Sequence, residues 1–308
     1  MFEQFTHHRI ATSGATIKLV KGGQGPPLLL LHGYPQTHVM WHQVAPLLSQ
    51  SFTVICSDLR GYGDSDKPPS DPEHLTYSKR ATAQDQVEVM ASLGFERFSV
   101  AGHDRGGRVL HRLLLDHPQR VEKAAVLDIV PTRKIFQTVD QELATAYEHW
   151  FFLIQPYDFP ERLIGADPAF YLKTKLHKWS ADSTGFTEDA MAEYIRCFSD
   201  RAVIHATCED YRAAASIDLV HDEVDINYKI QCPLLVLWGA RGVMQRRYDV
   251  LETWRERAVN VQGQALDCGH FLPEEAPQQT AIALLNFFGS PSGINRQTTN
   301  NTQQTMDY

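Results

Sequence analysis

The amino-acid sequence predicts an α/β fold with a mostly parallel central sheet flanked by helices, into which a helical cap is inserted. Two features support this fold class. Short, continuous apolar runs alternate with helix-forming segments through much of the chain, as in parallel strands joined by helices. The alternation stops near residue 132 and resumes near residue 232. We therefore expect a core built from residues 1–131 and 232–289, with a cap over residues 132–231.

The composition limits the class of protein. The 308 residues are 43% hydrophobic and 21% charged, which is enough for one large core and an inserted module. The net charge of −8 and the absence of Lys or Arg runs argue against a nucleic-acid surface. No apolar stretch is long enough to cross a bilayer, and the N-terminus lacks the pattern of a signal peptide. These features favour a cytoplasmic protein with no nucleic-acid or membrane partner.

The cysteines are odd in number, scattered along the chain and without metal-ligand spacing. Free thiols in a reducing compartment are the simplest interpretation. We expect neither a metal ion nor a cofactor. The five positions are Cys56, Cys197, Cys208, Cys232 and Cys268.

The first part of the chain supplies strands and a helix of the core in order. Gly22–Gly25 lies between two strand-like segments and is interpreted as a hairpin loop rather than a phosphate-binding loop, because no helix follows it. The apolar run Leu28–Leu31 indicates a buried parallel strand. The expected elements are strands over Thr16–Val20, Leu28–Leu31, Phe52–Ser57 and Phe98–Ala101, and a helix over Ser78–Leu93.

The second part contains the cap and the end of the core. Lys123–Pro131 is interpreted as a further buried strand, which carries a carboxylate, Asp128, near its end. The segment Thr132–Gln231 is rich in aromatic and helix-forming residues and lacks convincing strands, which predicts the helical cap. Residues 290–308 are mostly Asn, Gln, Thr and Ser, which predicts a disordered tail. Strands over Pro233–Trp238 and Val259–Leu266 and a helix over Gln278–Phe288 complete the expected core.

The central motif is Gly102-His103-Asp104-Arg105-Gly106, which follows an apolar strand and precedes an amphipathic segment. A strand, a tight turn and a helix in this order form a nucleophile elbow, where glycines let strand and helix approach closely. The apex residue is Asp104 instead of the usual Ser. A carboxylate suits displacement at saturated carbon, which gives an alkyl ester that water must then hydrolyse. The alternative is an ordinary glycine-rich turn.

The partners of Asp104 follow from the order nucleophile, acid, base that this type of elbow uses. His270 follows the last strand in a loop preceded by glycine, so it is the candidate base. After the preceding strand no carboxylate occurs until Asp249, which leaves Asp128 as the candidate acid. Asp128 would fix the His270 tautomer and stabilise the imidazolium. The alternatives are a capping role for Asp128 and a surface position for His270.

Two arginines beside the nucleophile indicate the kind of substrate. We expect Arg105 and Arg108 to point into the cleft, where guanidinium groups can bind a carboxylate with two parallel hydrogen bonds. This favours a small anionic organic substrate. The alternative is that both arginines pair with loop residues such as Asp64 or Asp66. The backbone N–H groups of Tyr34, which follows a buried strand, and of Arg105 are the candidate oxyanion donors.

Short motifs over nearly the whole chain, up to about Phe288, carry a resemblance. They are His32-Gly-Tyr-Pro-Gln36, Asp58-Leu-Arg-Gly-Tyr-Gly63, Gly102-His-Asp-Arg-Gly-Gly-Arg108, Leu127-Asp-Ile-Val-Pro-Thr132, His149-Trp150, Asp210-Tyr-Arg-Ala-Ala214 and Gly269-His-Phe271. With these motifs the chain resembles the fluoroacetate and haloacetate dehalogenases of the α/β-hydrolase superfamily. The resemblance implies a triad of Asp104, Asp128 and His270 and carboxylate binding by Arg105 and Arg108.

The resemblance also implies a halide pocket formed by His149, Trp150 and Tyr211. An imidazole, an indole and a phenol offer polar hydrogens that stabilise a leaving halide in a dry pocket. From the residues alone, His149 and Trp150 fit ordinary cap core better than a halide pocket, and the resemblance reverses this preference. The chain departs from the common family pattern at Tyr34, which is often Phe, and at Asp267-Cys268, which is often Gly-Gly.

Three functions are compatible with these features. The first is hydrolytic dehalogenation of a short 2-haloacid, haloacetate or fluoroacetate, to glycolate and halide, by SN2 attack of Asp104 and hydrolysis of the ester by water that His270 activates. The second is an epoxide hydrolase with the same nucleophile, which would need a pair of cap tyrosines and has no use for two arginines. The third is a non-catalytic receptor on the same fold. Substrate and water are the expected partners, and a homodimer is one candidate assembly.

Overall fold

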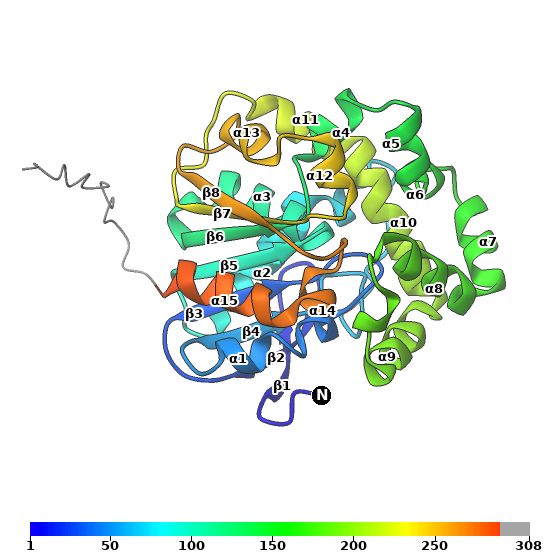
Figure 1. Ribbon diagram of the computed structural model, residues 1–308. Coiled ribbons are helices and arrows are strands. Elements are labelled where there is room, and N and C mark those ends of the chain that lie inside the picture. The colour runs from blue at the N-terminus through cyan, green and yellow to red at the C-terminus, as the bar shows by residue number, and fades with distance from the viewer. Residues whose placement is uncertain (290–308) are drawn as a thin grey trace, which may run out of the picture.

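An eight-stranded sheet forms the centre of the molecule (Figure 1). The computed structural model describes residues 1–289, apart from the side chain of Ser183. The strand order is β1-β2-β4-β3-β5-β6-β7-β8; β1–β2 and β2–β4 are antiparallel and the other pairs parallel, which confirms the predicted fold class. The strands are β1 (Thr6–Ala11), β2 (Thr16–Gly22), β3 (Pro27–Leu31), β4 (Thr53–Ser57), β5 (Phe98–His103), β6 (Val121–Leu127), β7 (Leu234–Gly239) and β8 (Val261–Leu266).

The predicted hairpin at Gly22–Gly25 is wrong. β2 and β3 are not neighbours, because β4 lies between them and pairs with β2 on one side and β3 on the other. The residues of Leu28–Leu31 are fully buried, so β3 needs a partner on both edges and finds them in β4 and β5. β2 pairs instead with β1, a strand that the sequence analysis did not find. The residues of β1 are largely polar and exposed, so this edge strand lacks an apolar run.

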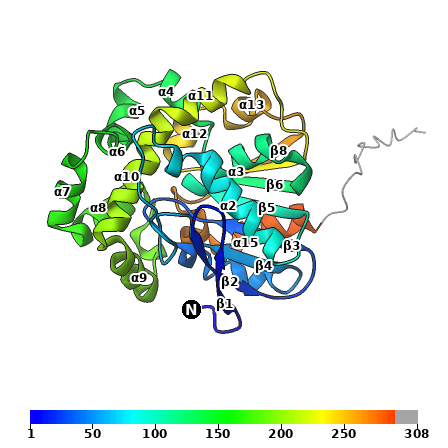
Figure 2. The same cartoon turned by 180° about the vertical axis from the view of Figure 1, so that it is seen from behind.

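Helices cover both faces of the sheet, as in other α/β folds. α1 and α15 lie in front of the sheet in Figure 1, whereas α2 and α3 lie in front of it in Figure 2. α2 begins after Ser78, whose side chain accepts a hydrogen bond from the backbone of Ala81 and so caps the helix where the sequence predicted. The helices of the core are α1 (Ala45–Leu48), α2 (Lys79–Ser92), α3 (Arg105–Asp116), α12 (Val243–Arg247), α13 (Val250–Arg255), α14 (Leu272–Glu275) and α15 (Pro277–Phe288).

The segment between β6 and β7 contains helices and no strand within the described residues, as predicted for the cap. These helices form a group beside one end of the sheet (Figure 1). The predicted disordered tail, residues 290–308, lies outside the described residues. The cap helices are α4 (Thr132–Gln137), α5 (Gln141–Ala146), α6 (Glu148–Phe152), α7 (Phe159–Ala166), α8 (Pro168–Trp179), α9 (Glu188–Phe198), α10 (Arg201–Ala215) and α11 (Ile217–Val224).

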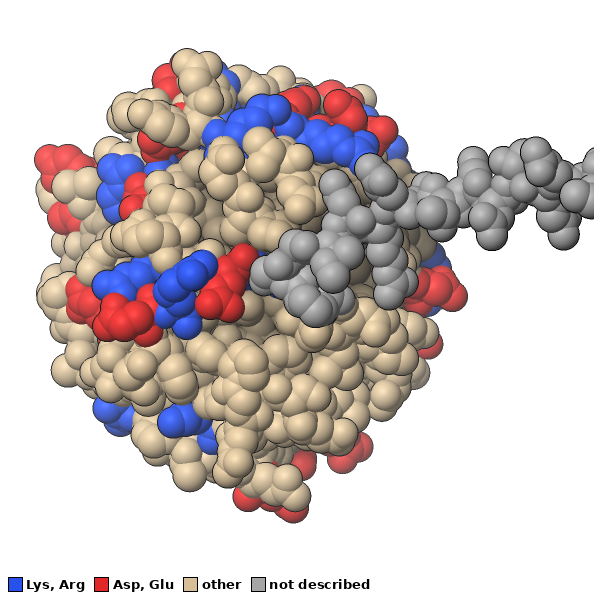
Figure 3. Space-filling model, turned by 90° about the vertical axis from the view of Figure 1, so that its left-hand side faces the viewer, with Lys and Arg blue, Asp and Glu red and all other residues tan. Residues whose placement is uncertain are grey.

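The surface carries charges of both signs. On the face shown in Figure 3, basic and acidic side chains lie close together in mixed groups. This mixing gives that face no broad field of one sign. Within residues 1–289, no helix has the length and apolar character that a bilayer span requires.

A buried glutamate joins the core to the cap. Glu274, in α14, is 2% exposed, and its Oε1 accepts hydrogen bonds from the hydroxyl of Tyr194 on cap helix α9 and from Nε2 of Gln36, at 3.2 Å, in the loop after β3. Burial raises the pKa of Glu274 from 4.5 to about 8, against the opposing effect of the Tyr194 hydrogen bond. At neutral pH this carboxyl group is therefore mostly protonated in the folded protein.

This protonation should make stability depend on pH. A carboxyl group with a pKa of 4.5 when unfolded and about 8 when folded contributes stability below pH 4.5 that is lost as the pH rises to about 8. Glu274→Gln cannot ionise. Relative to the unmodified protein, its free energy of unfolding should therefore increase by about 2 kcal/mol between pH 6 and pH 8.5. Urea denaturation at both pH values measures this difference, and a difference that does not change with pH would contradict the assigned protonation state.

Candidate active site

Asp104 lies at the turn between β5 and α3, where the sequence predicted the apex of an elbow. Its backbone has φ 44° and ψ −115°, a conformation that residues other than glycine rarely adopt. A Cβ on Gly102 would lie 2.5 Å from the carbonyl oxygen of Gly106, and a Cβ on Gly106 would lie 2.4 Å from that of His32. Only glycine therefore allows this close approach, which holds the Asp104 side chain at the apex.

The Asp104 carboxylate is buried and ionised. The backbone N–H of Tyr34 donates to its Oδ2 at 3.0 Å. Burial would raise the pKa of Asp104, but the positive charges of His270, Arg108 and Arg105 outweigh burial and hold the pKa below 3.8. Arg105 is the first residue of α3, where a backbone N–H has no carbonyl partner within the helix. The two predicted oxyanion donors, the backbone N–H groups of Tyr34 and Arg105, thus lie on segments that meet at the Asp104 carboxylate.

His270 and Asp128 are brought together across β7. Nδ1 of His270 lies 2.6 Å from Oδ2 of Asp128, and Oδ1 of Asp128 accepts from the backbone N–H of Gly239 at 2.9 Å. Because an ionised carboxylate only accepts hydrogen bonds, Nδ1 carries the hydrogen and Nε2 is free to take a proton. Burial lowers the pKa of His270, but the hydrogen bond and charge of Asp128, together with Asp104, leave it above 6.5.

The loop that carries His270 is held from two sides. The backbone N–H of His270 donates to the carbonyl of Trp179 in the cap, at 3.0 Å. The carbonyl of His270 lies 2.8 Å from Nε2 of His103, the residue before the nucleophile. Burial lowers the pKa of His103 to about 3, so its imidazole is neutral and donates this hydrogen bond. His103 therefore ties the candidate base to the elbow, a contact that the sequence analysis did not foresee.

Arg105 is held by a buried ion pair instead of pointing into the cleft as expected. Its Nε lies 2.6 Å from Oδ2 of Asp210, and its Nη2 donates to the backbone carbonyl of Asp210 at 2.8 Å. The alternative partners, Asp64 and Asp66, pair with other arginines near the surface. One edge of the planar guanidinium is thus occupied, so this edge cannot bind a ligand at two points. Within the described residues, its buried Nη1 has no hydrogen-bond partner.

Arg108 forms no ion pair with any described residue. Its Nη1 donates to the carbonyl of Val130 at 3.0 Å and to the Thr132 hydroxyl at 3.2 Å, and its buried Nε has no partner among residues 1–289. Burial lowers the pKa of Arg108, against the charge of Asp104. Burial acts on Arg105 in the same direction, but the charge of Asp210 leaves its pKa raised. Arg108 is thus a buried cation beside the nucleophile without a carboxylate at ion-pair distance.

The three residues predicted to hold a halide lie together. The ring centroid of Tyr211 is 5.5 Å from that of His149 and 5.9 Å from that of Trp150. The Tyr211 hydroxyl and His149 Nδ1 are buried and have no hydrogen-bond partner in the described part of the chain. Burial raises the pKa of Tyr211 well above 10 and lowers that of His149 well below 6.5, so the phenol keeps its proton and the imidazole is neutral.

A cavity of about 170 Å³ opens at these residues. Its lining includes the three triad candidates and His149 and Trp150. It also includes residues that were not predicted, among them two aromatic side chains, Tyr147 and Trp179, and three basic ones, Lys178, Arg241 and Arg246. Tyr147 lies two positions before His149 and could have been found from that spacing. Trp179 ends α8, far along the chain, and has no local sequence signal.

Arg105, Arg108 and Tyr211 are not among the residues that line this cavity, contrary to the expectation that the guanidinium groups of Arg105 and Arg108 open into the cleft. Both guanidinium groups pack against the Trp150 ring. The guanidinium carbon of Arg108 lies 4.5 Å from the ring centroid, and the guanidinium carbon of Arg105 lies 5.7 Å from it. The guanidinium of Arg105 also lies over the Tyr211 ring, at 4.0 Å. Aromatic faces thus cover both cations, which stabilises them in a buried setting.

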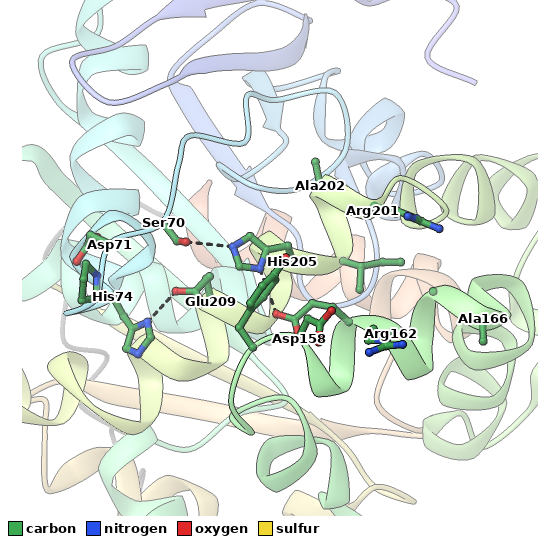
Figure 4. A pocket seen from close by; sticks show the side chains of 15 residues that line it. Ser70, Asp71, His74, Asp158, Arg162, Ala166, Arg201, Ala202, His205 and Glu209 are labelled. Carbon is green, nitrogen blue, oxygen red and sulfur yellow. Dashed lines mark hydrogen bonds and ion pairs between the residues drawn. The ribbon is translucent and has the colours of Figure 1, made fainter.

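A larger groove, of about 970 Å³, lies elsewhere, between the cap helices α7 and α10 and the loop before α2 (Figure 4). The hydroxyl of Ser70 lies 3.1 Å from Nε2 of His205, and Nδ1 of His74 lies 2.7 Å from Oε2 of Glu209. These contacts join a core loop to a cap helix. No residue of the predicted site lines this groove. The predicted nucleophile, Asp104, therefore lies at the smaller of these two cavities.

The described residues form no disulfide and no cluster of metal ligands. All five cysteines are free thiols, and Cys232 alone among them is not fully buried. Within residues 1–289, no cluster of three or more His, Cys, Asp or Glu side chains is arranged to hold a metal ion.

Comparison with known proteins places these features in a family. The sequence matches the α/β hydrolase fold family over residues 26–277. It is 46% identical to a fluoroacetate dehalogenase from Burkholderia sp over 298 residues, 96% of this chain and 98% of that protein. A soluble epoxide hydrolase from Corynebacterium sp. (strain C12) is 34% identical over 292 residues, 94% of this chain and 99% of that protein.

Solved structures agree with the sequence matches. A crystal structure assigned as an α/β hydrolase from Nostoc sp PCC 7120 has a TM-score of 0.93 and 64% identity, and the match covers 94% of this chain and 99% of that one. The family match spans most of the sheet, the elbow and the cap. The chain therefore belongs to the α/β-hydrolase fold family.

Proposed function

We propose that the protein hydrolyses the carbon–halogen bond of a short 2-haloacid and converts haloacetate or fluoroacetate to glycolate and halide. One observation carries the proposal: an ionised, buried Asp104 lies at the elbow beside Arg108, a buried cation that has no carboxylate at ion-pair distance among residues 1–289. An unpaired buried charge costs several kcal/mol, which a bound substrate carboxylate would offset. The relation to a fluoroacetate dehalogenase from Burkholderia sp supports the same reaction.

The first step is displacement of the halide. One carboxylate oxygen of Asp104 attacks the carbon that carries the halogen, a C–O bond forms, and the halide leaves with the electron pair of the broken bond. No proton is removed in this step. The unpartnered hydroxyl of Tyr211 and the neutral imidazole of His149 would donate hydrogen bonds to the halide as its charge develops, together with the indole of Trp150.

The second step is hydrolysis of the ester of Asp104. Nε2 of His270 takes a proton from water, whose oxygen attacks the ester carbonyl, and Asp128 stabilises the resulting imidazolium. The backbone N–H of Tyr34 already contacts an Asp104 oxygen, and it would stabilise the negative oxygen of the tetrahedral intermediate. Collapse of this intermediate releases glycolate. The imidazolium returns its proton to the leaving alkoxide, and the Asp104 carboxyl, which keeps the other proton of the water, releases it to solvent because its pKa is below 3.8.

The carboxylate of the substrate would bind Arg108 and the free Nη1 of Arg105. Each charge-assisted hydrogen bond contributes about 1.5–3 kcal/mol. Because neither guanidinium lines the cavity, side chains around Trp150 must adjust when the acid binds. The cavity volume of about 170 Å³ fits a substrate with few heavy atoms.

Epoxide hydrolysis is the second candidate function. It is favoured by the similarity to a soluble epoxide hydrolase and by two cap phenols near the nucleophile, Tyr147 and Tyr211, which could protonate an epoxide oxygen. It gives no role to Arg108. A receptor without catalysis, the third candidate from the sequence, gives no role to the hydrogen bond between His270 and Asp128.

A halide-release assay with fluoroacetate, chloroacetate and bromoacetate, run in parallel with diol formation from small epoxides, tests the proposal. We expect halide release with at least one haloacetate and little diol from the epoxides. Diol formation without halide release would assign the second function. Binding of haloacetate without either product would assign the third.

Replacement of Arg108 tests carboxylate recognition. Arg108→Lys keeps the charge but loses the planar donor geometry, so kcat/KM for chloroacetate should fall about tenfold or more. Chloroacetamide has no charge to pair, and its lower kcat/KM should change much less. Equal losses for acid and amide, measured by halide release, would show that Arg108 supports the fold rather than the substrate. Arg247→Lys is the control, because Arg247 is partly exposed, pairs with Asp140 and Glu142 and is not part of the proposed site.

The two steps should depend differently on pH. Displacement requires only ionised Asp104, whose pKa is below 3.8, whereas ester hydrolysis requires neutral His270, whose pKa is above 6.5. At pH 5.5 a rapid burst of about one halide per site should therefore persist while steady-state turnover falls. Rapid-quench measurement of halide from pH 5 to pH 8 checks this. A burst that shrinks in parallel with turnover would show that His270 also takes part in displacement.

A further inference from the structure

Asp210, in cap helix α10, is a buried carboxylate that the mechanism above does not use. It is 6% exposed, and four polar groups converge on it. Its Oδ2 accepts from Nε of Arg105 at 2.6 Å and from the hydroxyl of Tyr62 at 2.8 Å, and its Oδ1 pairs with Nζ of Lys79. Its backbone carbonyl accepts from Nη2 of Arg105 at 2.8 Å. A side chain held by this many contacts has a fixed position.

These contacts also fix the orientation of Arg105. The side chain and the backbone carbonyl of Asp210 occupy adjacent donors, Nε and Nη2, along one edge of the planar guanidinium. Nη1 lies at the opposite side and is the one nitrogen left without a partner among the described residues. The next residue on the helix, Tyr211, lies under the same guanidinium, 4.0 Å from its carbon. One turn of α10 thus orients Arg105 and also carries a predicted halide donor.

The charges of this cluster balance. Lys79 pairs with Asp210 and also lies 3.5 Å from Oδ2 of Asp218, so two cations, Arg105 and Lys79, face two carboxylates. Arg108, by contrast, has no carboxylate at ion-pair distance within the part of the chain that the structure describes. Asp210 therefore reduces the attraction of Arg105 for an anion while it fixes the direction of one N–H donor.

We propose that Asp210 is a positioning residue that holds Nη1 of Arg105 in place for the carboxylate of the substrate. It acts through Arg105 and does not itself touch the substrate. This inference rests on the proposed function, because it assigns Arg105 to the carboxylate of a haloacid. It predicts that loss of the Asp210 charge will slow displacement of the halide without weakening substrate binding. The reason is that Arg105 would attract an anion more strongly but would no longer be held in one orientation.

Asp210→Asn provides the test, with single-turnover halide release from chloroacetate as the readout. The rate constant for displacement should fall at least about tenfold, whereas the concentration that half-saturates it should stay the same or decrease. With chloroacetamide, which does not need Arg105, the rate constant should change less than threefold. Asp218→Asn is the matched control, because it removes the other carboxylate of Lys79 without touching Arg105. It should leave both quantities near those of the unmodified enzyme.

Tyr62→Phe gives a milder perturbation if Asp210→Asn does not fold. It removes one hydrogen bond to Asp210 but keeps the charge, so displacement of chloroacetate should slow by two- to fivefold while the reaction of chloroacetamide does not. Equal slowing of acid and amide in both variants, or equal effects of Asp210→Asn and Asp218→Asn, would overturn the positioning role.

A second readout does not require turnover. The variant Asp104→Asn lacks the carboxylate that forms the ester. Calorimetry compares chloroacetate binding to this variant with binding to the double variant that also carries Asp210→Asn. The added substitution should leave the affinity unchanged or tighter, with a less favourable enthalpy. Weaker binding would contradict the inference. Absence of any halide release from the unmodified enzyme would instead contradict the proposed function, so the two failures can be told apart.

Discussion

The site depends on two close approaches, one at Gly102 between β5 and α3 and one at Gly106 between α3 and the end of β3. Carbonyl oxygens occupy the positions where side chains would begin, so only glycine lets the strand turn so abruptly into the helix. This turn holds Asp104 in a strained backbone conformation and places its carboxylate beyond the strand. β6 and β8 run parallel to β5 and end at the same edge of the sheet, which brings Asp128 and His270 to the same cavity.

Buried charge explains what the elbow can do. Asp104 stays ionised because His270, Arg108 and Arg105 surround it, although burial opposes its charge. The core matches Arg105 with a carboxylate and leaves Arg108 unmatched. Asp104 acts on Arg108 through its charge but does not lie at ion-pair distance, so a small anion that pairs directly with the Arg108 guanidinium would offset part of the cost of burying this cation. The same charges keep the nucleophile reactive without removal of a proton, which suits displacement at carbon.

Local sequence patterns predicted most of the core and the positions around the elbow. Leu28–Leu31 could be predicted as a strand because a buried parallel strand is continuously apolar. The polar strand β1 and the crossing of Gly22–Gly25 over β4 could not, since they depend on which edges pair in the folded sheet. The closeness of Arg105 and Arg108 to Asp104 in the sequence predicts that both bind the substrate. The pairing of Arg105 with Asp210, 105 residues later, follows from cap packing and has no local signal.

The central claim is that Asp104 forms a covalent ester, and isotope labelling of this residue tests it most directly. A single turnover of chloroacetate in H₂¹⁸O, with enzyme in excess, followed by mass spectrometry of the peptide that contains Asp104, shows where the water oxygen goes. Our account predicts that ¹⁸O enters the Asp104 carboxylate, because water attacks the ester carbonyl rather than the carbon that carried the halogen. Label found in glycolate alone would mean direct attack by water and would contradict the account.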